Sequence, residues 1–290
     1  MTLNDSTTQT AFLAAPMAEV ARAAPAAMVY SPGGTRRQAA FAGISPWSDD
    51  YFRWARQTTI GDFHLIFTHG VRHLFSPTLT PGNFQEVNAH RHKLLQWVDW
   101  GVAGDDALRD YAQHGWRVRL LGGESVPELQ ATAARLEAET RTNSPHTLWW
   151  TVVPDPEAIW RALLQTAHES QATTRADLIR AHYGEDIPLI TLYLAFGKPI
   201  FSASILPPLL AGEVQAYWSQ QPGYGLTAER FRAILYDYAF LRQTWEQDKT
   251  GRAEAALPYR RVWERPLILG LGQRLGPHWY PANMPPVPRE

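Results

Sequence analysis

Predicted strands alternate with predicted helices along most of the chain, and this alternation limits the fold more than any other feature. Short apolar runs that end near Gly or Pro predict strands at 26–31, 71–76, 116–121, 147–153 and 189–196. Strands separated by helices are typical of βαβ units, whose crossovers build a parallel sheet. The sequence therefore predicts an α/β fold in which a mostly parallel sheet is flanked by helices.

The segments between these strands carry helical patterns. Helices are predicted at 49–69, 84–100, 106–114, 127–142, 157–171, 175–183, 206–217 and 227–245. Ser48 is a suitable N-cap for the first of them. Open parallel sheets bind ligands beyond the carboxyl ends of their strands. The loop after the first strand is therefore the first place to expect a binding site.

Composition separates a central domain from two terminal segments. Residues 1–25 are rich in Ala, Thr and Ser, which predicts a flexible arm. Residues 277–290 contain five prolines, which predicts an irregular tail. Residues 26–276 show no repeat and no break in composition, so we expect a single domain there.

Charge and cysteine content exclude several classes of function. The 290 residues include 27 Lys and Arg against 28 Asp and Glu, so the formal charge is −1 and no global positive field attracts nucleic acid. The absence of cysteine excludes disulfides, thiolate zinc sites and cysteine nucleophiles, and a reducing cytoplasm is the simplest compartment. No run of 18 apolar residues predicts a membrane span.

The strongest local signal is the loop Gly33-Gly34-Thr35-Arg36-Arg37 after the first predicted strand. Two glycines allow backbone N–H groups to approach a ligand closely, and Thr35 can donate a hydroxyl hydrogen bond. Two guanidiniums can form forked hydrogen bonds with phosphate oxygens, so the loop suits a diphosphate. The alternative is a surface turn with two solvated arginines. The local pattern slightly favours this alternative, and the position after the first strand makes the two interpretations equal.

A second motif, Asp49-Asp50-Tyr51, follows Ser48. Acids in the first turn of a helix are favourable without any chemistry, because they face the positive end of the helix dipole. In the functional interpretation, a carboxylate binds magnesium or the tyrosine hydroxyl positions water. Taken alone, the motif favours the purely helical explanation.

Histidines and aromatic residues give weaker signals. Gly70 interrupts the helix between His69 and His73, and His90 and His92 lie on different faces of a helix, so no zinc site is expected. The aromatic residues include the tryptophans Trp47, Trp54, Trp97, Trp100, Trp149, Trp150 and Trp160. Most of these tryptophans are expected to lie in the core or at a dimer interface. Some could line an apolar tunnel or face a carbocation.

The order of these motifs resembles the cis-prenyltransferase family, to which undecaprenyl diphosphate synthase belongs. Residues 29–37 are similar to the family's first strand and D-G-N-G-R-W diphosphate loop, and residues 74–76 to its strand ending in A-F-S. Residues 140–143 are similar to its T-x-x-N helix end. The resemblance implies the undecaprenyl diphosphate synthase fold and, by analogy, a homodimer.

Two departures from that family indicate a different reaction. Gly33 stands where the family has the loop aspartate that is linked to magnesium and catalysis. Residues 194–202 lack the arginines that bind the incoming isopentenyl diphosphate, and only Lys198 and Ser202 remain as polar substitutes. Chain elongation is therefore not expected. A catalytically silent partner subunit remains an alternative, against which Arg36 and Arg37 argue.

The chain is more specifically similar to the diterpene synthases of this fold, the group of tuberculosinol and kolavelool synthases. Residues 34–37 and 49–51 match the group's G-T-R-R and D-D-Y motifs. Residues 182–185 are similar to its Y-Y-G-E motif, and residues 233–242 to R-I-L-Y-D-H-x-Y-L-R. The resemblance implies that a bicyclic diterpenyl diphosphate, such as kolavenyl diphosphate, is ionised and that water gives an alcohol such as kolavelool.

The resemblance also implies roles for individual residues. The implied diphosphate-binding residues are Gly33, Gly34, Thr35, Arg36, Arg37 and Ser76. The implied catalytic residues are Tyr51, Arg37, Asp49 and Asp50. The implied hydrocarbon pocket consists of Trp47, Trp54, Phe75 and Trp97. Mg²⁺ is an expected cofactor because the leaving group is diphosphate, but the sequence does not identify its ligands.

Overall fold

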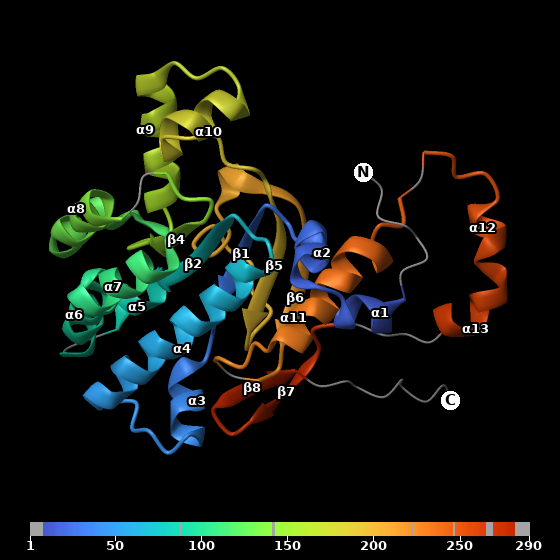
Figure 1. The fold of residues 1–290 in the computed structure, drawn as a ribbon, viewed down its shortest axis with the longest axis horizontal. Helices are drawn as coiled ribbons and strands as arrows, with labels where there is room; N and C mark the ends of the chain where they lie inside the picture. The colour runs from blue at the N-terminus through green and yellow to red at the C-terminus, as the bar shows by residue number, and fades with distance from the viewer. Residues whose placement is uncertain are drawn as a thin grey trace.

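The computed structural model describes residues 8–86, 89–140, 143–221, 223–245, 247–264 and 269–281. At its centre is a six-stranded sheet in which every neighbouring pair is parallel, with the order β3-β4-β2-β1-β5-β6 (Figure 1). The strands are β1 (Ala27–Ser31), β2 (His73–Leu79), β3 (Arg117–Leu121), β4 (Thr147–Val152), β5 (Ile190–Phe196) and β6 (Ala211–Ser219). The predicted α/β class is confirmed.

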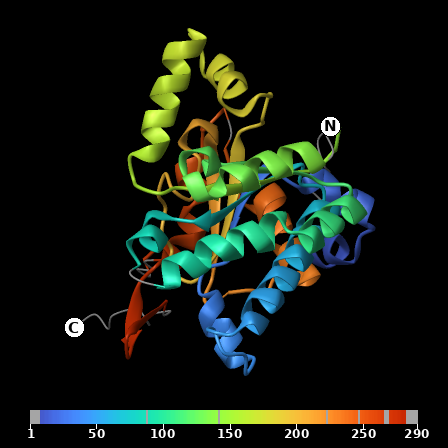
Figure 2. The same cartoon turned by 90° about the vertical axis from the view of Figure 1, so that its left-hand side faces the viewer.

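Helices flank this sheet, as the two views in Figures 1 and 2 show. They are α1 (Gln9–Ala14), α2 (Met17–Val20), α3 (Thr35–Phe41), α4 (Asp49–Thr68), α5 (Pro81–Gln85), α6 (Ala89–Ala103), α7 (Asp105–His114), α8 (Gln130–Glu139), α9 (Ala158–Ser170), α10 (Arg175–Tyr183) and α11 (Ala228–Tyr236). Two short helices, α12 (Arg252–Ala255) and α13 (Arg260–Trp263), lie away from the sheet at the right of Figure 1. None of the helices in the described ranges has both the length and the apolar character needed to cross a bilayer.

The two faces of the sheet carry separate hydrophobic cores, because successive side chains of a strand point to opposite faces. Tyr30 of β1 and Trp150 of β4 pack in the larger core, which includes α4 and α6. Val29 and Trp149 pack in the smaller core, which includes α10. This alternation decides which strand residues can reach a site on the α4 side.

The start of α4 forms as the sequence predicts. The Tyr51 amide donates a hydrogen bond of 3.3 Å to the Ser48 side chain, which caps the helix. Ala55, Thr59 and Phe63 follow at intervals of four residues, and all three are buried. Residues four apart share one face of a helix, so this row points toward the sheet.

The predicted helix at 206–217 is wrong, because these residues form the end strand of the sheet. A 3₁₀ turn at Pro208–Leu210 leads into β6, which pairs in parallel with β5. Pro207 and Pro208 lack backbone N–H groups, and Gly212 has low helix propensity, so pairing with β5 prevails over the weak helical pattern. The predicted helix at 227–245 is shorter than expected: α11 ends at Tyr236, and a π-helical turn covers Asp237–Leu241.

Both terminal segments contain more structure than their compositions indicate. α1 and α2 lie within the predicted flexible arm, and Phe12 is buried between the rings of Tyr236 and Phe240. The apolar side chains among the Ala and Thr residues account for this packing. At the other end, β7 (Gly272–Leu275) and β8 (His278–Pro281) form an antiparallel hairpin that crosses the predicted start of the tail at 277. Residues 1–7 and 282–290 lie outside the described ranges.

Candidate active site

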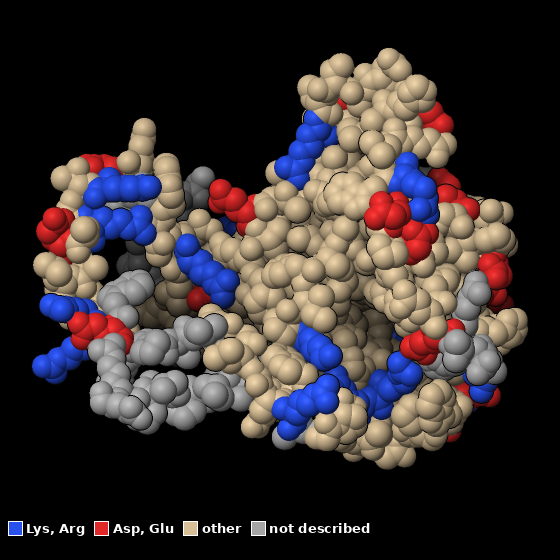
Figure 3. Space-filling view, turned by 180° about the vertical axis from the view of Figure 1, so that it is seen from behind, with Lys and Arg blue, Asp and Glu red and all other residues tan. Residues whose placement is uncertain are grey.

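A cavity of about 610 Å³ opens where the carboxyl ends of β1, β2 and β4 approach α3 and α4. Its volume lies within the range of roughly 300–1,000 Å³ that is usual for small-molecule sites. Figure 3 shows a hollow in the rear face of the molecule that is bordered by Lys and Arg side chains. The cavity occupies the edge of the sheet at which the sequence predicts a binding site.

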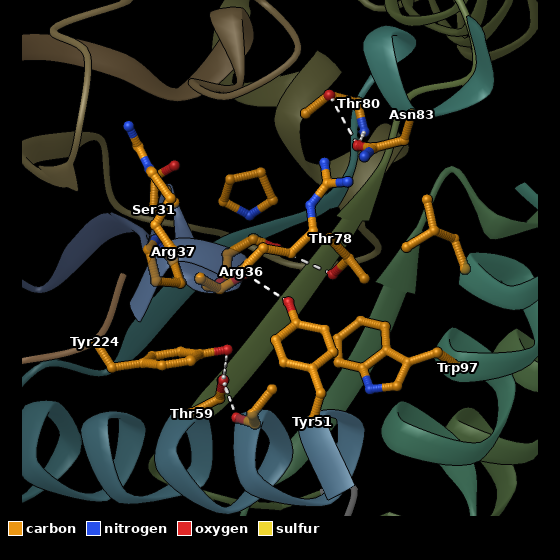
Figure 4. A pocket seen from close by; sticks show the side chains of 18 of the residues that line it. Ser31, Arg36, Arg37, Tyr51, Thr59, Thr78, Thr80, Asn83, Trp97 and Tyr224 are labelled. Carbon is orange, nitrogen blue, oxygen red and sulfur yellow. Dashed lines mark hydrogen bonds between the residues drawn. The ribbon is translucent and has the colours of Figure 1, made fainter. Parts of the chain in front are cut away.

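Two arginines give this cavity its charge. Arg36 and Arg37 both line it, as Figure 4 shows. Arg36 is exposed and forms an ion pair of 3.3 Å with Glu86. Arg37 is half-buried and takes part in no ion pair between described residues, and no Asp or Glu in the described ranges lines the cavity. The uncompensated guanidinium fits an anionic ligand group such as a diphosphate.

Glycines bring three backbone segments together beneath the arginines. Gly34 has a φ of +82° and starts α3. A Cβ on Gly33 would overlap the carbonyl oxygen of Phe196, so this position accepts no side chain while β5 stays in place. The Gly223 amide donates to the Gly33 carbonyl, and a Cβ on Gly223 would lie only 2.8 Å from Gln38 Cβ. The loop is therefore closely packed against its neighbours.

Ser76 supplies a hydroxyl at the same edge. It is completely buried, lines the cavity, and has no hydrogen-bond partner for its Oγ within the described structure. A buried polar atom without a partner costs free energy, so a ligand oxygen or a water is needed there. The position is compatible with the predicted diphosphate-binding role of Ser76.

Tyr51 also lines the cavity, and its hydroxyl lies 2.8 Å from Thr35 Oγ1 (Figure 4). Burial raises the pKa of Tyr51, while the hydrogen bond with Thr35 and the charge of Arg36 act in the opposite direction. The hydroxyl is therefore protonated at neutral pH. It can orient a water molecule by hydrogen bonding, but it is a weak base.

Sequence reasoning missed Tyr224, which lines the cavity from the loop before α11. Its hydroxyl and Thr59 Oγ1 are joined by a hydrogen bond of 3.0 Å, shown in Figure 4. Gly223 and Gly225 flank this tyrosine, and the segment has neither helical nor strand periodicity. A sequence pattern without periodicity could not place the residue at the site.

The rest of the wall is largely apolar. It includes Phe52, Leu94, Trp97, Trp150 and Ile205. The rings of Phe52 and Trp97 lie 6.2 Å apart and are tilted by 34°. Trp97 was expected in a hydrocarbon pocket. Trp150 was not, although the alternation of side chains along β4 distinguishes it from Trp149 once the site is known to lie on the α4 face.

The structure does not bring Asp49 and Asp50 into the cavity. Both are exposed in the first turn of α4, and Asp50 forms an ion pair of 3.1 Å with Arg53. The favourable interaction of acids with the start of a helix accounts for both residues. Their predicted catalytic role therefore has no geometric support, in contrast to that of Tyr51.

Three of the four aromatic residues predicted for the hydrocarbon pocket also lie outside the cavity lining. Trp47 is 62% exposed. Phe75 points to the opposite face of the sheet, where its ring stacks on Trp149 at 5.5 Å. Trp54 packs edge-on against Tyr224 at 5.4 Å, so it supports a lining residue without lining the cavity itself.

Magnesium, the expected cofactor, does not fit the residues of this cavity. Mg²⁺ is usually held by one or two carboxylates together with phosphate oxygens. The described lining supplies no carboxylate, and position 33 has no room for one. Among the described residues, no group of three His, Asp or Glu side chains could hold a metal ion. In place of a metal ion, the described lining offers the guanidiniums of Arg36 and Arg37 to an anionic ligand.

Known proteins with similar sequences are terpenoid enzymes. The chain is 48% identical over 273 residues to (+)-kolavelool synthase of Herpetosiphon aurantiacus, which covers 94% of each chain. It is 26% identical over 239 residues to tuberculosinyl adenosine transferase of Mycobacterium tuberculosis, covering 78% of this chain and 79% of that protein. No protein-family model matches the chain.

Solved structures with a similar fold include prenyl diphosphate synthases. A probable undecaprenyl diphosphate synthase from Campylobacter jejuni has a TM-score of 0.56 at 14% identity, over 77% of this chain and 97% of that chain. Lavandulyl diphosphate synthase from Lavandula x intermedia, in complex with dimethylallyl diphosphate, has a TM-score of 0.57 at 14% identity, over 75% and 96%. At 48% identity over nearly its whole length, the chain belongs to the family of (+)-kolavelool synthase, terpene synthases built on the cis-prenyltransferase fold.

Proposed function

We propose that this enzyme ionises a bicyclic diterpenyl diphosphate and captures the resulting cation with water. Kolavenyl diphosphate is the proposed substrate, and kolavelool and diphosphate are the products, because the relative at 48% identity is named for kolavelool. One observation carries the proposal: the half-buried Arg37 lies in a largely apolar cavity whose described lining contains no acid. Such a cavity suits a hydrocarbon with an anionic head.

In the first step, the allylic C–O bond breaks and its electron pair leaves with the diphosphate. Negative charge then grows on the leaving group, and the guanidiniums of Arg36 and Arg37 stabilise it. The Ser76 hydroxyl, which has no partner within the described structure, donates a further hydrogen bond to an oxygen of the leaving group. The apolar walls keep bulk water from the cation that remains.

In the second step, an oxygen lone pair of one bound water forms a bond to the cation. The Tyr51 hydroxyl, held by Thr35 at 2.8 Å, orients this water. A protonated tyrosine is a weak base, but water bound to a carbocation is strongly acidic. The released proton passes to the departed diphosphate, which leaves a neutral alcohol.

Two alternative functions fit the geometry less well. Elongation of a prenyl chain needs a second set of cationic side chains, which binds the incoming isopentenyl diphosphate. In the corresponding region, residues 194–196 are buried in β5. Lys198 and Ser202 are exposed and do not line the cavity. A silent partner subunit has no use for an unpaired arginine in a cavity of this size.

Incubation of the purified enzyme with clerodane, labdane and geranylgeranyl diphosphates tests the proposal. Each substrate is tested with and without isopentenyl diphosphate, and with adenosine as a competing acceptor, because one relative is named for transfer to adenosine. Mass spectrometry is expected to show kolavelool and equimolar diphosphate from the clerodane substrate. Longer diphosphates, an adenosine adduct as the main product, or no turnover would each refute the proposal.

Replacing Tyr51 with phenylalanine is expected to lower the yield of alcohol about 100-fold, at the lower end of the roughly 10²–10⁴-fold range for general acid–base effects. The fold should be retained, because only one hydroxyl is removed from a half-buried ring. Gas chromatography of the products measures alcohol against hydrocarbons formed by proton loss. An unchanged ratio in Tyr51→Phe would remove this hydroxyl from water capture.

We further propose that the enzyme is a cytoplasmic homodimer. The proposal rests on analogy with the fold and on the absence of cysteine from the sequence. Light scattering during size-exclusion chromatography is expected to give twice the chain mass of 32.7 kDa. A monomer that is fully active would contradict the assembly.

A further inference from the structure

Asp62 is the one buried acid among the described residues, with 6% of its surface exposed. The Tyr30 hydroxyl donates a short hydrogen bond to its Oδ2. No ion pair between described residues includes Asp62. A carboxyl buried without a cationic partner is costly, so a compensating role is expected for it.

This carboxyl lies directly behind the inner wall of the cavity. Ala55 and Thr59 of α4 line the cavity, and Asp62 follows Thr59 by three residues, which places it one turn further on the same helix face. The centroid of the Phe63 ring lies 5.1 Å from that of the cavity-lining Trp150 and 6.2 Å from that of Tyr30. The near neighbours of the carboxyl thus include two cavity-lining residues, Thr59 and Tyr224.

The surroundings of Asp62 leave it able to ionise at neutral pH. Burial raises the pKa of Asp62 to about 7, although the hydrogen bond from Tyr30 acts in the opposite direction. Facing it are two titratable groups, Tyr30 from β1 and Tyr224 from the loop before α11. Both are neutral at this pH, because burial and the carboxyl raise their pKa values. Near neutrality, a fraction of the enzyme thus carries an uncompensated buried negative charge.

We propose that the ionised Asp62, positioned by Tyr30, stabilises the carbocation that forms when the diphosphate leaves. The negative charge of the leaving group is balanced by the arginines, and Asp62 provides negative charge behind the α4 wall of the cavity. In a cavity that excludes water, such a charge acts with little screening. This inference rests on the proposed ionisation reaction, and it assigns a function to a residue that the two steps above do not use.

Replacement of Asp62 with asparagine tests the inference, because the amide keeps the shape and still accepts the hydrogen bond from Tyr30. We expect kcat to fall on the order of 100-fold, comparable to the loss of one preorganised electrostatic group. KM should change little, because the hydrocarbon part of the intact substrate carries no positive charge for Asp62 to stabilise. The wild-type kcat should increase as the pH rises through about 7, because Asp62 ionises in that range. This rising limb of the pH profile of kcat should be absent in Asp62→Asn.

Stability measurements separate this electrostatic role from a structural one. The pKa of Asp62 in the folded protein is higher than its usual value, so its contribution to stability is full at low pH and is lost as the pH rises through about 7. The loss begins near the usual value of 3.8, so Asp62→Asn should exceed the wild-type Tm by a larger margin at pH 8 than at pH 5. A variant that is less active but more stable cannot be explained by damage to the fold.

Two further variants serve as second readout and control. Tyr30→Phe removes the hydrogen bond that lowers the pKa of Asp62, so the limb of the pH profile should move to higher pH. As the control, His278 of the cavity lining is replaced in His278→Gln, which should keep the limb. The inference is overturned if Asp62→Asn keeps the wild-type kcat and pH profile, or if its Tm falls at both pH values. Failure of the wild type to ionise any diterpenyl diphosphate would instead refute the proposed function.

Discussion

Replacing Arg37 with alanine is expected to lower kcat about 100- to 1,000-fold, which corresponds to roughly 2.7–4 kcal/mol of lost transition-state stabilisation. This guanidinium is half-buried in the cavity and has no ion pair within the described structure. Its charge is therefore free to act on the leaving diphosphate. Arg36 should matter less, because it is exposed and its charge is partly balanced by Glu86 at 3.3 Å.

Steady-state kinetics on the clerodane substrate measure this effect, with Arg53→Ala as the matched control. Arg53 lies near the start of α4, is paired with Asp50 and does not line this cavity. Arg37→Lys keeps the charge but loses the forked geometry, so it should recover only part of the activity. Near-normal turnover in Arg37→Ala with an unchanged Tm would show that the diphosphate binds elsewhere.

The fold follows from local patterns where these are strong. The five predicted strands form β1 to β5, because short apolar runs that end at Gly or Pro fit a buried parallel sheet. β6 was missed because it is an end strand that is only partly buried, and its mixed pattern resembles an amphipathic helix. Phe12 was missed because its partners, Tyr236 and Phe240, lie more than 200 residues away in the sequence.

The candidate site shows the same division between local and distant information. The loop at 33–37 and Tyr51 were expected at the site from the resemblance of the G-T-R-R and D-D-Y motifs, and the hydroxyls of Thr35 and Tyr51 do lie 2.8 Å apart. Asp49 and Asp50 share the motif with Tyr51, yet their positions on α4 direct them to solvent. Tyr224 and Asp62 could not be found from local pattern, since each depends on a contact with a residue more than 30 positions away.

Replacing Gly33 with aspartate is expected to reduce both stability and turnover, and it should not create a magnesium site. The cis-prenyltransferases, which the loop resembles, have an aspartate at this position, but here a Cβ would overlap the Phe196 carbonyl oxygen. Overpacking of this kind costs about 1–3 kcal/mol, so Tm should fall by several degrees. A shift of the loop by about 1 Å would also misplace Arg37, for which a loss of about 100-fold in kcat is expected.

The variant Gly33→Ala separates the effect of size from that of the carboxylate. Its methyl group meets the same carbonyl oxygen without adding a metal ligand, so the two variants should lose similar amounts of stability and activity. Calorimetric titration with inorganic diphosphate, in the presence of magnesium or of a chelator, measures binding apart from turnover. If Gly33→Asp were active and gained affinity for diphosphate only with magnesium, the loop would be more adaptable than its packing against β5 indicates. The proposal that side chains bind the diphosphate without a metal ion would then fail.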